Sequence, residues 1–449
     1  MPITPRHAAV LAALAGLLST TPAGAQGEAG DASWTDTIDL SAIFRTETAV
    51  QTGDGHLQKL DVVLQPELSA WLGDDLKLTA IGRARFDPVD ELEPGRPGQD
   101  MRSAPSRRLL LGDTTDLELR ELFVDTTAGD TFLRLGKQQV VWGQADGIRV
   151  LDLVNPLSYR EFILPSYEDR RIPLWTVNAE VPVGSSLLQL LWIPDQTYDD
   201  LPEAGAPFAV TAPSLVPRRP VGIPVTVREP DRPDDPIGDS DVGARLTTFV
   251  EGWDLSLNYL YHYHDQVIPF REATGAGVVV TPRYERSHLI GGTFSNAFGS
   301  TTLRGEIGYN TDRHFVTADA ADADGISRSD ELAYVLGLDY NGLTDTLVSG
   351  QLFQSVLTDH EPGIVRDRTE TTLTLLVRRT FLNQVVTAEA LAIHNLNDGD
   401  GVVQFDLDYL LRGNVVLSLG ADQFYGGSNG VYGQFRDASR VTFGVEIGF

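Results

Sequence analysis

Apolar and polar residues alternate with a period of two along most of the chain after residue 26. In the last segment, for example, Val441, Phe443 and Val445 share one face, whereas Thr442 and Glu446 belong to the other. A period of two is typical of a β-strand with one apolar and one polar face, and helical periodicity is rare in this chain. The pattern therefore predicts an all-β protein.

About eighteen such segments can be counted, each roughly 10–14 residues long, which is the length of a tilted membrane-spanning strand. Sixteen strands are the alternative, because short neighbouring strands are easily merged or split. An even number is expected in either case, since both ends of such a chain lie at the same membrane surface. The segments are centred near residues 42, 65, 81, 120, 136, 178, 190, 246, 258, 291, 306, 336, 350, 375, 390, 407, 419 and 444.

The links between these segments alternate between short and long. The short turns lie at 73–75, 128–130, 183–185, 251–253, 298–300, 341–342, 382–383 and 412–414. The long, polar links lie at 50–57, 87–113, 144–172, 195–239, 264–284, 312–330, 357–368, 396–401 and 425–437. This alternation predicts a transmembrane antiparallel β-barrel with short periplasmic turns and long extracellular loops. A secreted all-β sandwich is the alternative, but it gives no reason for the alternation.

Charged and aromatic residues support the membrane barrel over the sandwich. A polar lumen explains the charges on one face of the strands, and closure removes the unpaired strand edges that hydrocarbon does not tolerate. Aromatic side chains suited to the two membrane interfaces are Tyr259, Tyr261, Tyr263, Tyr309, Tyr409, Phe443 and Phe449. The final strand, ending at Phe449, resembles the C-terminal signal by which the barrel-assembly machinery recognises outer-membrane proteins. We therefore expect an outer-membrane protein of a Gram-negative bacterium that contacts outer-membrane lipid.

The alternation slips in places within the predicted strands. Between Glu118 and Leu122 the polar and apolar phases cross. This predicts either a β-bulge or a strand that is covered on both faces.

The first 25 residues have the features of a secretory signal peptide. A single charge, Arg6, precedes an apolar run from Ala8 to Leu18, and Ala23-Gly24-Ala25 supplies a small-residue cleavage site. A short buried or anchoring helix is the alternative, but the apolar run is too short to span a membrane. The sequence thus divides into a signal peptide at 1–25 and a barrel at 26–449.

Composition excludes several classes of function. The chain has 35 basic and 63 acidic residues, a formal net charge of −28, which argues against nucleic acid as a partner. It has no cysteine, so disulfides, thiolate metal sites and a cysteine nucleophile are excluded. No cofactor is expected.

One stretch of the chain resembles a known family. It runs from Leu133 to Asp146 as LRLGKQQVVWGQAD and is followed by Asn155-Pro156 and by Arg171-Ile172-Pro173. It is similar to an uncharacterised family of proteobacterial outer-membrane β-barrel proteins with the signature G-K-Q-x-x-x-W-G, N-P and R-x-P. The resemblance implies a barrel in the outer membrane, and some relatives are found beside exporters of hydrophobic compounds.

The link at 144–172 is unusual because charged and apolar residues are interleaved in it. We expect it to fold into the mouth or lumen as a constriction loop, with a surface loop packed on its neighbours as the alternative. The narrowest zone is expected beside Arg134, Lys137, Gln138 and Trp142. The full set of expected pore-lining residues is Arg83, Arg85, Arg134, Lys137, Gln138, Trp142, Arg149, Arg170, Arg171, Arg304, Glu306, Asp339, Asp406, Asp408 and Glu446.

Four other segments have some features of a site. The Pro-rich link at 195–239 is expected to be an external loop or partial lid. Segment 320–331 partly matches a calcium loop but has Ala320 at its first position, where a ligand is needed. The interpretation we favour is that its acidic residues match the pattern by chance, with a calcium site as the alternative. Residues 426–430 fit G-x-S-x-G in a predicted loop instead of a strand-to-helix turn. His262 and His264 are expected to be solvated.

No catalytic or metal-binding residues are therefore expected, and the protein is not expected to be an enzyme. The predicted function is a porin-like outer-membrane channel for the passage of small or amphiphilic solutes. The alternative is a plugged outer-membrane partner in the export or trafficking of hydrophobic or lipid-like compounds. Oligomeric state and substrate are left open.

Overall fold

The computed structural model describes residues 37–217, 222–319 and 321–449. Asp39–Phe449 forms one compact unit. The predicted signal peptide lies outside the described residues.

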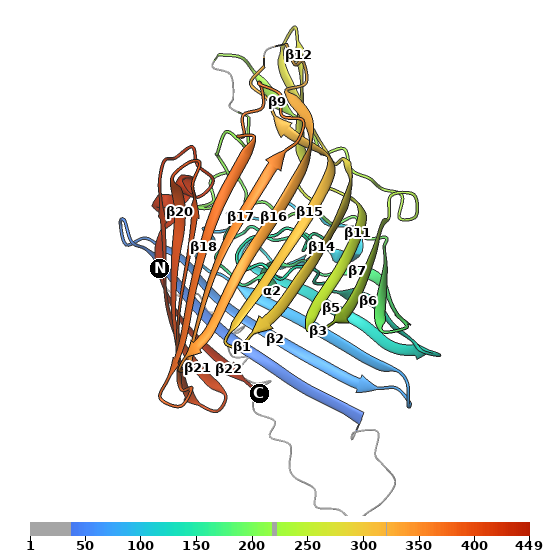
Figure 1. The fold of residues 1–449 in the computed structure, drawn as a ribbon. Coiled ribbons are helices and arrows are strands. Elements are labelled where there is room, and N and C mark those ends of the chain that lie inside the picture. The colour runs from blue at the N-terminus through green and yellow to red at the C-terminus, as the bar shows by residue number, and fades with distance from the viewer. Residues whose placement is uncertain (1–36, 218–221, 320) are drawn as a thin grey trace, which may run out of the picture. The chain divides into compact units, whose positions relative to one another are not determined.

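Within the described residues, eighteen antiparallel strands form the wall of a closed barrel (Figure 1). Each pairs with its neighbours in sequence, and β1 pairs with β22, which closes the wall. The strands are β1 (Ile38–Gln51), β2 (Leu57–Trp71), β3 (Lys77–Phe86), β5 (Thr115–Ala128), β6 (Thr131–Gln138), β7 (Leu174–Val183), β8 (Ser186–Ile193), β10 (Asp241–Val250), β11 (Trp253–Tyr263), β14 (Arg286–Phe298), β15 (Thr301–Val316), β16 (Ile326–Leu343), β17 (Thr346–Leu357), β18 (Thr369–Phe381), β19 (Val386–Asn395), β20 (Asp400–Arg412), β21 (Val415–Tyr425) and β22 (Arg440–Gly448).

The smaller elements belong to the long links. Strand β4 (Leu109–Leu110) pairs with β5, and β9 (Val225–Val227), β12 (Ile268–Thr274) and β13 (Gly277–Arg283) form a separate three-stranded sheet. In Figure 1, β9 and β12 project beyond the ends of the wall strands. The helical turns are η2 (Ala104–Ser106), α2 (Tyr167–Arg170) and η3 (Gly433–Ala438).

The predicted strand pattern is confirmed. Each predicted segment centre lies inside one wall strand. Short and long links alternate between β3 and β18, but the links at 52–56 and 396–399, which were predicted to be long, are as short as the neighbouring turns at 72–76 and 382–385. The slip within Glu118–Leu122 is a β-bulge, because Ile81 pairs with Glu121 and Gly82 pairs with Leu119, which leaves Arg120 without a partner position. The turn expected at 341–342 lies slightly later, since β16 runs to Leu343.

The two faces of the wall differ as the alternation predicts. On β15, Glu306 is 2% exposed whereas the adjacent Ile307 is 49% exposed, and on β11 Asn258 and Leu257 differ in the same way. A band of exposed apolar side chains covers the outside of the strands, among them Leu135, Leu246, Leu257, Ile290, Ile307, Leu336, Leu338, Leu375, Phe405, Leu419, Val441 and Phe443. No helix in the described residues is long and apolar enough to cross a membrane.

Candidate functional site: a divided lumen

The long link between β6 and β7 crosses the inside of the barrel. At one end, Asp146 contacts Arg304 of β15 and accepts a hydrogen bond from Gln351 of β17 at 2.6 Å. At the other end, Arg160 contacts Asp61 of β2 at 2.9 Å. The link therefore connects two well-separated parts of the wall.

Apolar packing holds the first half of this link in place. Val150, Leu151 and Val154 form one buried cluster with inward-facing residues of β11, β14 and β16. Glu306 of β15 accepts hydrogen bonds from the backbone nitrogens of Gln144 and Leu151. These backbone donors would otherwise be buried without a partner, so the carboxylate stabilises the folded link.

Residues 157–170 of the link form what we call the partition, because its two faces border different cavities. Leu157, Tyr159, Phe162, Ile163 and Tyr167 face one cavity. Ser158, Arg160, Glu161, Leu164 and Asp169 face the other. Arg170 borders both cavities.

The first cavity is large and mainly apolar, with a volume of about 1360 Å³. It lies at the long-loop ends of β15, β16 and β17 and is walled by the partition, the link after β8 and the β9–β12–β13 sheet. Its apolar lining includes Ile148, Val150, Leu201, Val210, Leu215, Val225, Val227, Val278, Val280 and Val431. We call it the apolar cavity.

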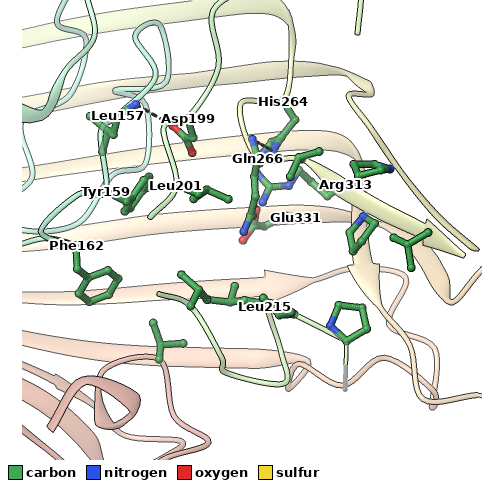
Figure 2. A pocket seen from close by; sticks show the side chains of 18 of the residues that line it. Leu157, Tyr159, Phe162, Asp199, Leu201, Leu215, His264, Gln266, Arg313 and Glu331 are labelled. Carbon is green, nitrogen blue, oxygen red and sulfur yellow. Dashed lines mark hydrogen bonds and ion pairs between the residues drawn. The ribbon is translucent and has the colours of Figure 1, made fainter. Parts of the chain in front are cut away.

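Polar side chains gather on one side of the apolar cavity. Figure 2 shows His264, Gln266, Arg313 and Glu331 close together, with Phe162 and Leu215 away from them. Burial lowers the pKa of His264 well below its ordinary value, with a further contribution from the charge of Arg313, so this imidazole is neutral. Charged groups also line the cavity at Arg149 and Arg170, so its mainly apolar lining has polar groups at more than one place.

The second cavity, of about 240 Å³, is lined by charged residues of both signs, and we call it the polar cavity. Glu161 of the partition lies 2.7 Å from Lys59 of β2 and 2.6 Å from Arg440 of β22. Burial opposes ionisation of Glu161, but the charges of Lys59, Arg440 and Arg160 outweigh it and hold its pKa well below the ordinary value. These ion pairs fasten the partition to the wall on this side.

The structure separates the predicted pore-lining residues into groups. Arg83, Arg85, Arg170 and Asp406 line the polar cavity, and Arg149 and Arg170 line the apolar cavity. A second group holds the crossing link: Arg304 pairs with Asp339 and Asp146, and Arg171 pairs with Asp152 at 2.6 Å. Asp408 and Glu446 line neither cavity, and Glu446 pairs with Arg45 of β1 at 3.0 Å.

The four residues expected at the narrowest zone line neither cavity. Lys137 and Gln138 are each 1% exposed and donate hydrogen bonds to backbone carbonyl oxygens, Lys137 to that of Leu119 at 2.8 Å. Trp142 is fully buried and donates to Gln189 at 2.8 Å. Arg134 pairs with Asp125 at 2.7 Å. None of the four borders either cavity, and their contacts lie within the wall and at the start of the crossing link.

Sequence reasoning missed several residues that border the polar cavity. Lys59 and Asp61 of β2 and Arg440 and Asp422 at the β21–β22 pair all line it. A signal was present, because Lys59 and Asp61 are two positions apart on the polar face of a predicted strand. The apolar cavity carried no such signal, since its lining comes from several separate links.

The Pro-rich link differs from the expected external loop in its first half. Tyr198, Phe208 and Ala212 are buried, whereas residues 222–239 are mostly exposed. The acidic residues at the start of the link find partners inside the mouth: Asp200 lies 3.1 Å from Arg102, and Asp199 accepts a hydrogen bond from the Leu157 nitrogen at 2.8 Å. These contacts allow this half of the link to pack within the mouth of the barrel.

The other candidate segments lack features of a ligand site. His262 is 3% exposed, so the expectation that it is solvated was wrong. In the calcium-like segment, Glu331 pairs with Arg366 at 3.0 Å, and Ala320 lies outside the described residues. No group of three or more metal-ligating side chains is found in the part of the chain that the structure describes. The G-x-S-x-G segment lies in the long link between β21 and β22.

A closed antiparallel barrel of this kind is the fold of outer-membrane channels. OccAB3 of Acinetobacter baumannii matches with a TM-score of 0.50 at 9% sequence identity, covering 92% of this chain and 98% of that one. The outer-membrane channel DcaP of A. baumannii matches with a TM-score of 0.42 at 10% identity, covering 92% of this chain and 97% of that one. An OmpT loop-deletion mutant of Vibrio cholerae gives 0.40 at 10%, covering 92% and 99%.

The family is also defined. The chain belongs to the DUF1302 family, described as a protein of unknown function, whose model matches residues 6–449. No curated protein matches the chain in sequence.

Proposed function

We propose that the protein is an outer-membrane channel for small amphiphilic solutes, with a lumen divided by the partition. The observation that carries this proposal is the apolar cavity of about 1360 Å³ inside the long-loop mouth of a barrel whose inward-facing wall residues are largely polar. Its volume exceeds the roughly 300–1,000 Å³ typical of small-molecule pockets. A general porin for sugars or ions has no use for such an apolar chamber.

The outside of the barrel supports a membrane location. The exposed apolar band would bury its surface against acyl chains, which contributes about 25 cal/mol for each Å² removed from water. The closed wall satisfies the backbone hydrogen bonds that lipid cannot satisfy. Under this proposal the signal peptide exports the chain, and the strand ending at Phe449 is recognised by the assembly machinery.

Passage would proceed through two different environments. The apolar part of a solute would leave water in the apolar cavity, while its polar part stays beside the polar groups of the lining, which include Arg149, Arg170 and Arg313. Beyond the partition, charges of both signs in the polar cavity would orient the solute through the local field. The partition, with Arg83, Arg85, Arg170 and Asp406 beside it, would then be the constriction.

A second function is supported by the ion pairs of the partition. Glu161 and Arg160 are held on the wall side by Lys59, Arg440 and Asp61. Breaking buried ion pairs is costly, so a fixed partition would plug the lumen. The protein would then act as a partner in the export or trafficking of hydrophobic compounds, and the cavity would hold cargo instead of passing it.

Efflux from proteoliposomes tests the proposal and separates the two functions. Vesicles with purified full-length protein are loaded with radiolabelled decanesulfonate, a permanently charged amphiphile that crosses lipid poorly, and with glucose. We expect decanesulfonate to leave faster than glucose and faster than from protein-free vesicles. Equal release of both solutes would indicate a general pore, and release no faster than from protein-free vesicles would favour the plugged partner.

A further inference from the structure

Two arginines at the apolar cavity form no ion pair within the described residues. The guanidinium of Arg149 donates to the carbonyl oxygens of Asp152 and Asn155 at 3.2 and 3.0 Å. Arg170, only 4% exposed, donates to the carbonyl oxygen of Phe162 at 3.3 Å and lies 4.5 Å from the ring of Tyr167. Within the described residues neither forms an ion pair, and the Nε of Arg170 has no hydrogen-bond partner.

The two guanidiniums act on the same region of the cavity. The charge of Arg149 contributes to lowering the pKa of Arg170, after burial as the main cause, and both arginines interact electrostatically with Tyr159 and Tyr167, which line the same cavity. Two like charges beside one region of low polarity, with no anion at ion-pair distance, are unfavourable. A bound anion would stabilise both.

Nearby carboxyl groups of the described residues do not pair with Arg149 or Arg170. Glu331 is engaged by Arg366 at 3.0 Å and by Arg313 at 3.6 Å. Asp199 and Asp265 form no ion pair with either arginine within the described residues. Burial raises the pKa of both carboxyls, although the charge of Arg149 lowers it. Within the described residues, neither guanidinium therefore has a carboxylate at ion-pair distance, and both donate to backbone carbonyl oxygens.

The geometry points to a binding site for an anionic amphiphile, in which Arg149 and Arg170 bind the acidic headgroup and the apolar cavity holds the hydrocarbon part. This inference rests on the proposed function and names the charge of its solute. A guanidinium offers paired N–H donors that fit carboxylate, sulfonate and phosphate oxygens, so these headgroups share the same recognition chemistry. The Tyr159 hydroxyl lies on the same face of the partition and supplies a neutral donor.

The apolar lining of the cavity also fits the hydrocarbon chain of such a ligand. The lining of Val225, Val227, Val278 and Val280 lies on the β9–β12–β13 sheet, away from the partition that carries Arg170. An amphiphile with its headgroup at the partition would place its chain against this sheet. A cationic amphiphile would instead bring like charges together in a poorly solvated site, which is unfavourable.

Calorimetric binding to the full-length protein in lipid nanodiscs tests the inference. The probes are decanesulfonate, decanol and decyltrimethylammonium, which share one chain length and differ in headgroup charge, with empty nanodiscs as the blank. The variant is R149Q/R170Q, and R436Q, which changes an exposed arginine that lines neither cavity, is the matched control. A charge-retaining variant, R149K/R170K, guards against loss of the partition's structure.

We expect the wild type to bind decanesulfonate at least about tenfold more tightly than decanol or decyltrimethylammonium. The reason is that one hydrogen bond to a charged group lowers a dissociation constant by about tenfold or more. R149Q/R170Q should lose this preference and still bind decanol, whereas R149K/R170K and R436Q should keep it. Binding of all three probes with equal affinity to the wild type, or an unchanged preference in R149Q/R170Q, would overturn the inference. Because binding is measured without transport, efflux without this preference refutes only the inference, and the preference without efflux refutes only the channel.

Discussion

Gly136 shows how a single residue fixes the start of the crossing link. Its φ is +134°, and a Cβ built there would lie 2.2 Å from the carbonyl oxygen of Leu122 on the neighbouring strand. Both the backbone conformation and the space require glycine. The glycine of the G-K-Q-x-x-x-W-G signature is thus explained by backbone geometry, and Lys137, Gln138 and Trp142 by burial and hydrogen bonds, instead of by a lining role in the pore.

We predict that Gly136→Ala lowers the free energy of unfolding by about 1–3 kcal/mol, as expected for strain at such a position. Guanidinium unfolding of the refolded barrel, followed by its gel mobility before and after heating, measures this change. Gly350→Ala is the control, because a Cβ there meets no atom within 4 Å and the backbone is not in the left-handed region. Equal midpoints for the two variants would contradict the explanation.

Arg160 of the partition forms ion pairs with several acidic residues. It lies 2.9 Å from Asp61, 2.8 Å from Asp87 and 3.0 Å from Glu93, and its side chain is 8% exposed. Its removal would leave several carboxylates facing each other in a poorly solvated site, at a cost of about 3–5 kcal/mol.

We therefore predict that Arg160→Met loosens the partition. Hydrogen exchange in nanodiscs should show faster exchange of amides in residues 157–170, with the wall strands unaffected. Arg328→Met, which removes an arginine that is 67% exposed, should change nothing there. If the partition stays as protected as in the wild type, its ion pairs do not hold it in place.

At the scale of elements, strands were predictable and links were not. Each wall strand has one face toward lipid and one toward the lumen, so burial follows from position in the strand alone, and even the bulge at Arg120 was visible as a slip in the alternation. The link at 195–239 has no such rule. Phe208 is buried because it packs with Phe424 and Phe435 of distant segments, which local composition does not reveal.

Replacement of residues 147–168 by a short flexible linker tests the role of the crossing link. Single-channel conductance in planar bilayers should rise, because the deleted residues include most of the partition and the ion pairs that Arg160 and Glu161 form with the wall. Shortening the β12–β13 hairpin by a similar procedure should leave the conductance unchanged, since it borders only the outer side of the apolar cavity. An unchanged conductance after the first replacement would contradict the constriction.

For the complete barrel, closure could be predicted from the repeated alternation of apolar and polar residues. The candidate site could not be predicted from that pattern. The short and long links predicted the number and direction of the strands, because antiparallel closure leaves few alternatives. The apolar cavity is assembled from Leu157, Leu201, Val225, Val280 and other residues of separate links, each of which is ordinary in its own segment. Only their placement around the partition creates a chamber.

Current through single channels in planar bilayers, with decanesulfonate added to one side at a time, tests the divided lumen most directly. The apolar cavity lies among the long links, so we expect decanesulfonate to reduce the ionic current at lower concentration when it is added on the long-loop side than on the short-turn side. Equal block from both sides, or a conducting channel that decanesulfonate does not block at all, would contradict a lumen divided into an apolar and a polar chamber.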